Sequence, residues 1–220
     1  PVVLIAAGPG AGKSQALAAL LRAAPAGAVC AWLACDPYDA DAAELFHHLL
    51  AAVRLAVPGA GAGLEAALAG GRSEPRALWE RLFADLAAYG GPGAVLALDD
   101  LHLLAEALPD VLAGLGQALG RLPAGLRLLL ATRKRLPLPL ARLEAQGRVA
   151  RLGAAELAFT PDEARAFAAA RGVAPDARLA EALAGWLLGW DLATRAGIDP
   201  AAARERLLAG AGALAKYVAE

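Results

Sequence analysis

The chain has 220 residues, enough for one large domain or for one and a half domains. Hydrophobic residues make up 58% of it, and a formal net charge of −1 gives no support for nucleic-acid binding by this chain itself. No apolar stretch free of charges reaches about 18 residues, and the first residues lack the basic flank of a signal peptide. The two cysteines, Cys30 and Cys35, suit neither a disulfide nor a metal site, so we expect a protein of the reducing cytoplasm with no membrane partner.

The first fourteen residues, PVVLIAAGPGAGKS, are typical of a phosphate-binding loop. An apolar run predicts a strand over residues 2–6, a glycine-rich turn follows, and an Ala/Leu-rich pattern predicts a helix over 14–24. Backbone N–H groups of such a loop surround a phosphate chain, Lys13 reaches the β- and γ-phosphates, and the Ser14 hydroxyl ligates Mg²⁺. The predicted nucleotide-binding residues are Gly8, Pro9, Gly10, Ala11, Gly12, Lys13, Ser14 and Gln15.

One position departs from the pattern G-x-x-x-x-G-K-[ST], because Ala7 stands where the first glycine is expected. The alternative interpretation is an ordinary glycine-rich turn with a solvated Lys13 in the first turn of the helix. A cation at a helix N-terminus is unfavourable unless an anion lies there too. The position of Lys13 therefore favours phosphate binding.

Three elements are expected between the loop and the next informative stretch. The continuously apolar residues 28–35 predict a second buried strand, and an amphipathic pattern over 42–55 predicts a helix capped by one of the preceding aspartates. Residues 56–75 are rich in glycine and proline, which leaves open a mobile lid or a loose surface insertion. Leucine and aromatic residues at helical spacing predict a helix over 76–89.

Residues 94–104, AVLALDDLHLL, predict a buried strand that ends in two carboxylates. In open α/β sheets ligands bind beyond the carboxyl ends of the strands. Asp99 there can hold the Mg²⁺ shell, and Asp100 can orient or deprotonate the attacking water. A solvated acidic turn is the alternative, but the phosphate loop upstream favours a catalytic pair.

A third catalytic candidate follows the next strand. After a helix predicted over 106–121, the apolar residues 126–132 predict a strand that ends at Arg133, whose fork geometry suits γ-phosphate oxygens. Lys134 and Arg135 come next, so a basic solvated turn is the alternative. With a short last strand over 148–153, four or five parallel strands joined by helices predict a doubly wound α/β domain.

Beyond this domain the pattern is helical only. Thr160, Pro161 and Glu163 are typical of a helix start, and further helices are predicted over about 176–194 and 200–218. We therefore predict a nucleotide-binding domain over 1–157 and a helical domain over 158–220, truncated at its C-terminal end. The chain begins within a predicted strand, so we expect it to be a piece of a longer protein.

These stretches together resemble the nucleotide-binding core of the MalT/large LuxR-type transcription regulators, within the STAND class of signal-transduction ATPases. The matching motifs follow the family's order across nearly the whole chain: AAGPGAGKS, AWLACDPYDAD, AVLALDDLHLL, GLRLLLATRKRLPLPLARLEAQGRV, LGAAELAFTPDEA, GWLLGWDLA and LAKYVAE. Ala7 is usual in that family. Leu187 is a departure, since the family's pattern usually has a proline there, near the bound base.

The resemblance implies a P-loop NTPase fold with a parallel sheet in the order 5-1-4-3-2 and a small all-helical domain that closes over the nucleotide. It implies a slow Mg²⁺-dependent ATPase that acts as a switch, with resting ADP-bound monomers and self-association when ATP is bound. DNA would bind only through a domain outside this chain. The family's acidic pair carries over to Asp99 and Asp100, and its γ-phosphate sensor to Arg133. Its phosphate and Mg²⁺ contacts carry over to Gly8, Gly10, Gly12, Lys13 and Ser14.

Functions of other classes stay open on the residues alone. One is a constitutive P-loop ATPase or a small-molecule kinase, although a kinase needs an arginine-rich lid and residues 56–75 contain only Arg72. Another is a nucleotide-binding scaffold that does not hydrolyse its ligand.

Overall fold

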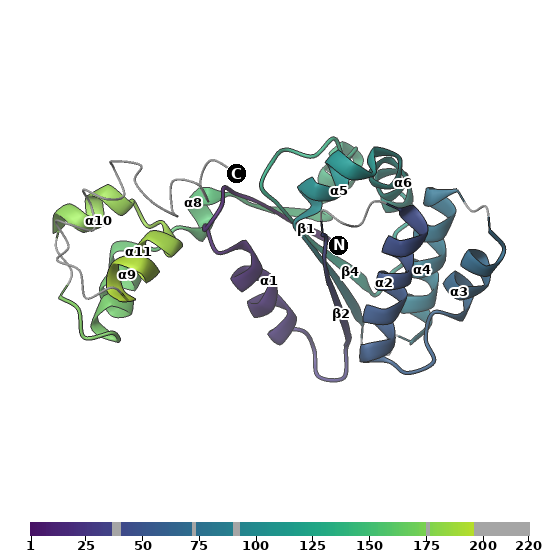
Figure 1. Ribbon diagram of the computed structural model, residues 1–220, viewed down its shortest axis with the longest axis horizontal. Helices are drawn as coiled ribbons and strands as arrows, with labels where there is room; N and C mark the ends of the chain where they lie inside the picture. The colour runs from purple at the N-terminus through teal and green to yellow at the C-terminus, as the bar shows by residue number, and fades with distance from the viewer. Residues whose placement is uncertain (37–40, 72–73, 90–92, 175–176, 196–220) are drawn as a thin grey trace. The chain divides into compact units, whose positions relative to one another are not determined.

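The computed structural model describes residues 1–36, 41–71, 74–89, 93–174 and 177–195. The chain divides into two compact units, which Figure 1 shows together with the element labels. The first unit comprises Pro1–Ala6 and Ser14–Leu152, and the second comprises Ala7–Lys13 and the chain from Gly153 onward. The phosphate loop therefore groups with the C-terminal helices. The domain boundary at 157/158 stays a prediction.

A five-stranded parallel sheet forms the centre of the first unit. Its strands run in the order β2-β3-β4-β1-β5, which is the expected order 5-1-4-3-2 listed from the other edge. Every residue of β3 is buried, because helices cover the central strands and apolar side chains can face both layers. The predicted α/β P-loop fold is confirmed. The strands are β1 (Val2–Ala6), β2 (Val29–Ala34), β3 (Ala94–Asp99), β4 (Leu126–Thr132) and β5 (Val149–Leu152).

The register of the sheet determines which residues meet at its carboxyl edge. Ala6 at the end of β1 pairs with Thr132 at the end of β4, and Ala34 at the end of β2 pairs with Asp99 at the end of β3. Because β3 and β4 are also neighbours, Asp99 and Thr132 leave the sheet at the same edge. This edge is where a parallel α/β sheet places its ligands.

Seven helices connect the strands of the first unit in the described part of the chain. The predicted helix over 106–121 is in fact two helices, because Pro109 begins α6 in its first turn and has no N–H to continue α5. The connector over 56–75 contains the short helix α3, whose Leu64 N–H donates to the carboxylate of Asp85 at 2.8 Å. The helices are α1 (Lys13–Arg22), α2 (Ala42–Ala56), α3 (Ala62–Ala69), α4 (Pro75–Tyr89), α5 (Leu101–Ala107), α6 (Pro109–Leu119) and α7 (Ala141–Ala145).

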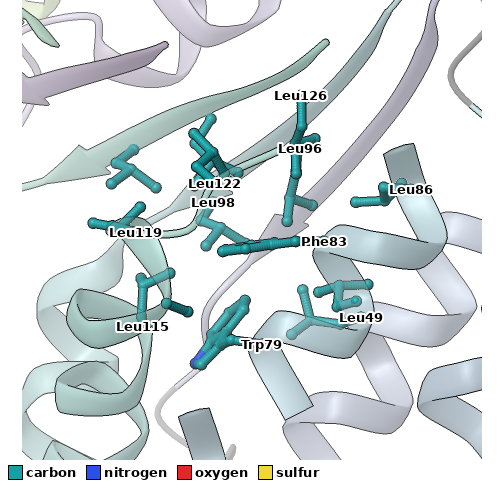
Figure 2. Packing of buried hydrophobic residues seen from close by; sticks show 14 of the residues in the cluster. Leu49, Trp79, Phe83, Leu86, Leu96, Leu98, Leu115, Leu119, Leu122 and Leu126 are labelled. Atoms are coloured by element: carbon teal, nitrogen blue, oxygen red, sulfur yellow. The ribbon is translucent and has the colours of Figure 1, made fainter. Parts of the chain in front are cut away.

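The main core lies between the sheet and the helices α2, α4 and α6 (Figure 1). Figure 2 shows Trp79 and Phe83 of α4 among leucines from α2, β3 and α6. Trp79 is 1% exposed, and its indole N–H donates to the Val111 carbonyl at 3.0 Å, so its single polar group is satisfied. This core holds the sheet that positions the acidic strand end.

The second unit contains α8 (Ala154–Leu157), α9 (Pro161–Ala169), α10 (Ala177–Leu183) and α11 (Leu187–Arg195). The predicted helix start at Thr160 is confirmed, since Thr160 and Glu163 cap each other reciprocally. The helix predicted over 176–194 is interrupted at Ala184 and Gly185, which both have positive φ. The helix predicted over 200–218 lies outside the described residues. Among the described helices, none has the length and apolar character needed to cross a membrane.

Candidate functional site

The acidic end of β3 is tied to the start of α1. Asp99 is the last residue of β3 and is 3% exposed. Its Oδ2 accepts a hydrogen bond from the Ser14 hydroxyl at 2.5 Å, and its Oδ1 accepts one from the Asp100 N–H at 2.9 Å. A buried carboxylate needs such donors. The structure therefore brings Ser14 and Asp99 together, 85 residues apart in the sequence.

Asp100 sits in a backbone conformation that non-glycine residues rarely adopt. Its φ of 51° and ψ of 38° lie in the left-handed region, and it forms the N-cap of α5 without capping that helix through its side chain. Its carboxylate Oδ1 lies 3.8 Å from Nε of Arg133 and 3.7 Å from Nδ1 of His102. The carboxylate therefore lies near these two side chains and makes no capping hydrogen bond to the start of α5.

His102 lies beside the predicted acidic pair, and the sequence analysis did not select it as a candidate. It is 6% exposed, on the first turn of α5, two residues after Asp100. The signal available in the sequence was the spacing D-D-x-H, which places a titratable group beside the acidic pair. A buried imidazole near a carboxylate can hold that carboxylate in one orientation.

The loop Ala7–Lys13 belongs to the second unit, and two of its glycines have positive φ. Gly10 has φ +69° and Gly12 has φ +88°, values that glycine adopts without steric cost. Lys13 is 7% exposed, and its Nζ donates to the carbonyl oxygen of Gly8 at 3.0 Å. Successive N–H groups in such a turn form a concave site for a phosphate oxygen.

The predicted site residues fall into two groups by unit. In the first unit the structure brings Ser14 to Asp99 and Arg133 to Asp100, while Gln15 lies exposed on α1. In the second unit Lys13 contacts its own loop through Gly8. The remaining predicted loop residues are Pro9, Gly10, Ala11 and Gly12.

The residues at the end of β3 are chemically suited to Mg²⁺. The hydroxyl of Ser14 and the carboxylate of Asp99 are hard oxygen donors 2.5 Å apart. Mg²⁺ in nucleotide sites takes one or two protein oxygens and obtains the rest from phosphates and water. The described residues contain no cluster of three or more acidic, histidine or cysteine ligands, and this type of site needs none.

Three comparisons with known proteins show what the chain is similar to. A model of the AAA ATPase domain family matches residues 1–131. The chain is similar to the HTH-type transcriptional regulator MalT of Serratia proteamaculans, at 30% identity over 162 residues. The matched region makes up 70% of this chain but 18% of that regulator, so the chain spans a small part of this relative.

Among solved structures, the chain is similar to the Aeropyrum pernix ORC1 protein in complex with DNA, at 18% identity and a TM-score of 0.42. That similarity covers 97% of this chain and 54% of the other. It is also similar to Drosophila ORC bound to AT-rich DNA and Cdc6, at 13% identity and a TM-score of 0.43, covering 98% of this chain and 71% of the other.

Proposed function

The chain belongs to the AAA ATPase domain family, and we propose that it is the ATP- and ADP-binding switch module of a signal-responsive transcription regulator of the STAND class. The similarity to MalT supports the type of regulator. Because the chain corresponds to 18% of that relative, signal sensing and DNA binding are assigned to domains outside this chain. A cytoplasmic location is part of the same proposal.

The observation that carries the nucleotide-binding part is the hydrogen bond between Ser14 and Asp99. Ser14 ends the motif G-A-G-K-S, and Asp99 ends a buried strand, so a loop residue and a strand-end carboxylate meet as a metal site requires. Lys13 directly precedes Ser14 and brings its charge to the loop. We propose that the loop N–H groups and Lys13 bind the β- and γ-phosphates, and we propose Ser14 and Asp99 as the Mg²⁺ ligands.

Asp100 is the proposed acceptor for the proton of the attacking water. Its carboxylate is within 4 Å of two cationic or titratable side chains, Arg133 and His102. Arg133 would stabilise the negative charge of the γ-phosphate in the transition state. Mg²⁺, when bound, would neutralise part of the negative charge of the phosphates.

ATP hydrolysis is proposed to switch the chain between two states. A regulator needs a long-lived ATP state and a long-lived ADP state, so turnover is expected to be slow. We propose that the ATP-bound chain self-associates and that the ADP-bound chain is monomeric. The similarity to a transcription regulator supports this use of the nucleotide.

The test begins with mass spectrometry of the nucleotide that copurifies with the chain. Thermal unfolding with millimolar Mg·ADP or Mg·ATP should then show stabilisation, about 2.7 kcal/mol at a ligand concentration of 100 Kd. Lys13→Ala should abolish it, whereas Arg121→Ala, which removes an exposed cation of the first unit away from the proposed site, should not. No shift in the parent chain would contradict nucleotide binding.

Sedimentation velocity with each nucleotide tests the switch. We expect a larger species with Mg·ATP than with Mg·ADP. Rapid turnover without any effector would favour a constitutive ATPase instead. Bound ATP that survives for hours with Mg²⁺ would favour a scaffold that does not hydrolyse its ligand.

A further inference from the structure

Two backbone carbonyls of the phosphate loop accept hydrogen bonds from the start of α11, all within the second unit. Nε1 of Trp186 donates to the carbonyl oxygen of Pro9 at 3.1 Å, and the N–H of Leu188 donates to the carbonyl oxygen of Gly10 at 3.0 Å. Leu188 is the second residue of α11, where a helix leaves its N–H groups without an intrahelical partner. The loop supplies that partner.

These bonds determine the direction of the loop's own donors. A trans peptide is planar, so the C=O of one residue and the N–H of the next point to opposite sides, and the described residues contain no cis peptide. With the Pro9 carbonyl held toward Trp186, the Gly10 N–H points away from Trp186. By the same geometry, the Gly10 carbonyl held by Leu188 turns the Ala11 N–H away from α11.

The contact is close enough to hold the loop in one position. A Cβ on Gly10 would lie 2.6 Å from Cβ of Leu188 and 2.9 Å from Nε1 of Trp186. Contacts of this length do not occur for real Cβ atoms. Two separate constraints therefore require glycine at position 10. One is its φ of +69°, and the other is the packing of the start of α11 against its backbone.

The start of α11 is itself held by the rest of the helical unit. Trp190 is 1% exposed in the small core of that unit. Nη1 of Arg171, two residues after the end of α9, donates to the Asp191 carboxylate at 2.5 Å and to the Thr194 hydroxyl at 2.9 Å. The two donors that bond to the loop therefore lie at the start of a helix that packing and hydrogen bonds hold in place.

We propose that Trp186 and Leu188 are positioning residues that orient the Gly10 and Ala11 N–H groups for a phosphate before the ligand arrives. Donors that already point at an anion need no ordering on binding, so the helical unit raises the loop's affinity for phosphates without contacting the base. Pro9 has no N–H, so Gly10 and Ala11 carry the first donors after Gly8. The inference rests on the proposed nucleotide-binding function.

The test compares the parent with Trp186→Phe, which keeps an aromatic ring and removes the donor to Pro9. Isothermal titration calorimetry is run with Mg·ADP and with Mg²⁺ plus inorganic pyrophosphate, which carries phosphates but no base. We expect both ligands to bind about three- to tenfold more weakly, the net value of one hydrogen bond. Trp32→Phe, the same change at a half-exposed position of β2, should bind both ligands as the parent does.

Two results would overturn the inference. One is a Trp186→Phe variant that binds pyrophosphate as tightly as the parent, whatever its melting temperature; if that variant binds ADP more weakly, Trp186 acts at the base. The other is an equal loss of affinity in Trp32→Phe. If the parent binds neither ligand, the proposed nucleotide-binding function fails instead.

Discussion

The hydroxyl of Thr132 bonds to the backbone of Lys134 in both directions. Its Oγ1 donates to the Lys134 carbonyl at 2.8 Å and accepts from the Lys134 N–H at 3.2 Å. Thr132 is fully buried at the end of β4, so the residue between the two partners, Arg133, is carried on a turn fixed at both sides. Lys134 also pairs with Glu106 of α5 at 2.5 Å, which fastens the turn to the helix after the acidic pair.

Replacing Thr132 by valine should therefore loosen Arg133 without changing the shape of the buried side chain. We expect ATP hydrolysis to fall by about tenfold, since two hydrogen bonds of about 0.5–1.5 kcal/mol each are lost. ADP affinity should not change, because ADP lacks the γ-phosphate that Arg133 is proposed to contact. Thr132→Ser keeps the hydroxyl and should restore the rate. Equal rates in Thr132→Val and the parent would contradict this role.

Asp99 and Asp100 are adjacent but contact different side chains, so we expect their asparagine variants to lose different properties, Mg²⁺-dependent binding in one and hydrolysis in the other. Asp100→Asn removes the proposed proton acceptor and should lower single-turnover ATP hydrolysis by about 10²- to 10⁴-fold while sparing nucleotide binding. Asp99→Asn removes the negative charge that accepts from Ser14 and should weaken Mg²⁺-dependent binding. The measurement is single-turnover hydrolysis beside calorimetry with and without Mg²⁺. Wild-type turnover in Asp100→Asn would remove Asp100 from the mechanism.

Local patterns predicted the elements whose causes are local. The apolar runs of β3 and β4 and the Thr160 cap lie where the sequence placed them, because burial on both faces and helix capping depend on adjacent residues. The single helix predicted over 106–121 was wrong, although Pro109 within that helical pattern indicates a helix boundary. The strand order was expected only from the family resemblance.

The contacts of the site could not be predicted in the same way. Trp186 and Pro9 are 177 positions apart, and no periodicity connects an indole to a loop carbonyl over that distance. The left-handed backbone of Asp100 occurs in the turn from β3 into α5, and aspartate, like other non-glycine residues, adopts it rarely, so the sequence alone did not predict it. The 3.7 Å approach of His102 to the Asp100 carboxylate depends on that turn.

The cap of α9 should make the stability of the chain depend on pH in the acidic range. Hydrogen bonds from the backbone and hydroxyl of Thr160 hold the pKa of Glu163 below its usual value. A carboxyl with a lowered pKa in the folded state stabilises the fold above its unfolded pKa and loses that contribution as the pH falls through the folded value. Glu163→Gln should therefore be less stable than the parent at pH 7, and the gap should close below about pH 4.

Thermal unfolding across this pH range measures the effect of Glu163. Glu181→Gln, on α10, makes the same change of charge at an exposed site and serves as the control. A gap between Glu163→Gln and the parent that does not vary with pH would show that the charge of Glu163 plays no part in the cap.

The core under the acidic strand depends on the aromatic residues of α4. Phe83 is 1% exposed, and its ring centroid lies 5.9 Å from that of Trp79 (Figure 2). Phe83→Ala should lower the free energy of unfolding by about 3–5 kcal/mol, because the lost contacts leave a cavity between helix and sheet. Tyr89→Ala, on the same helix but 48% exposed, should change it by about 0.5 kcal/mol or less. Urea unfolding of both variants provides the measurement, and equal losses would show that α4 does not pack as described.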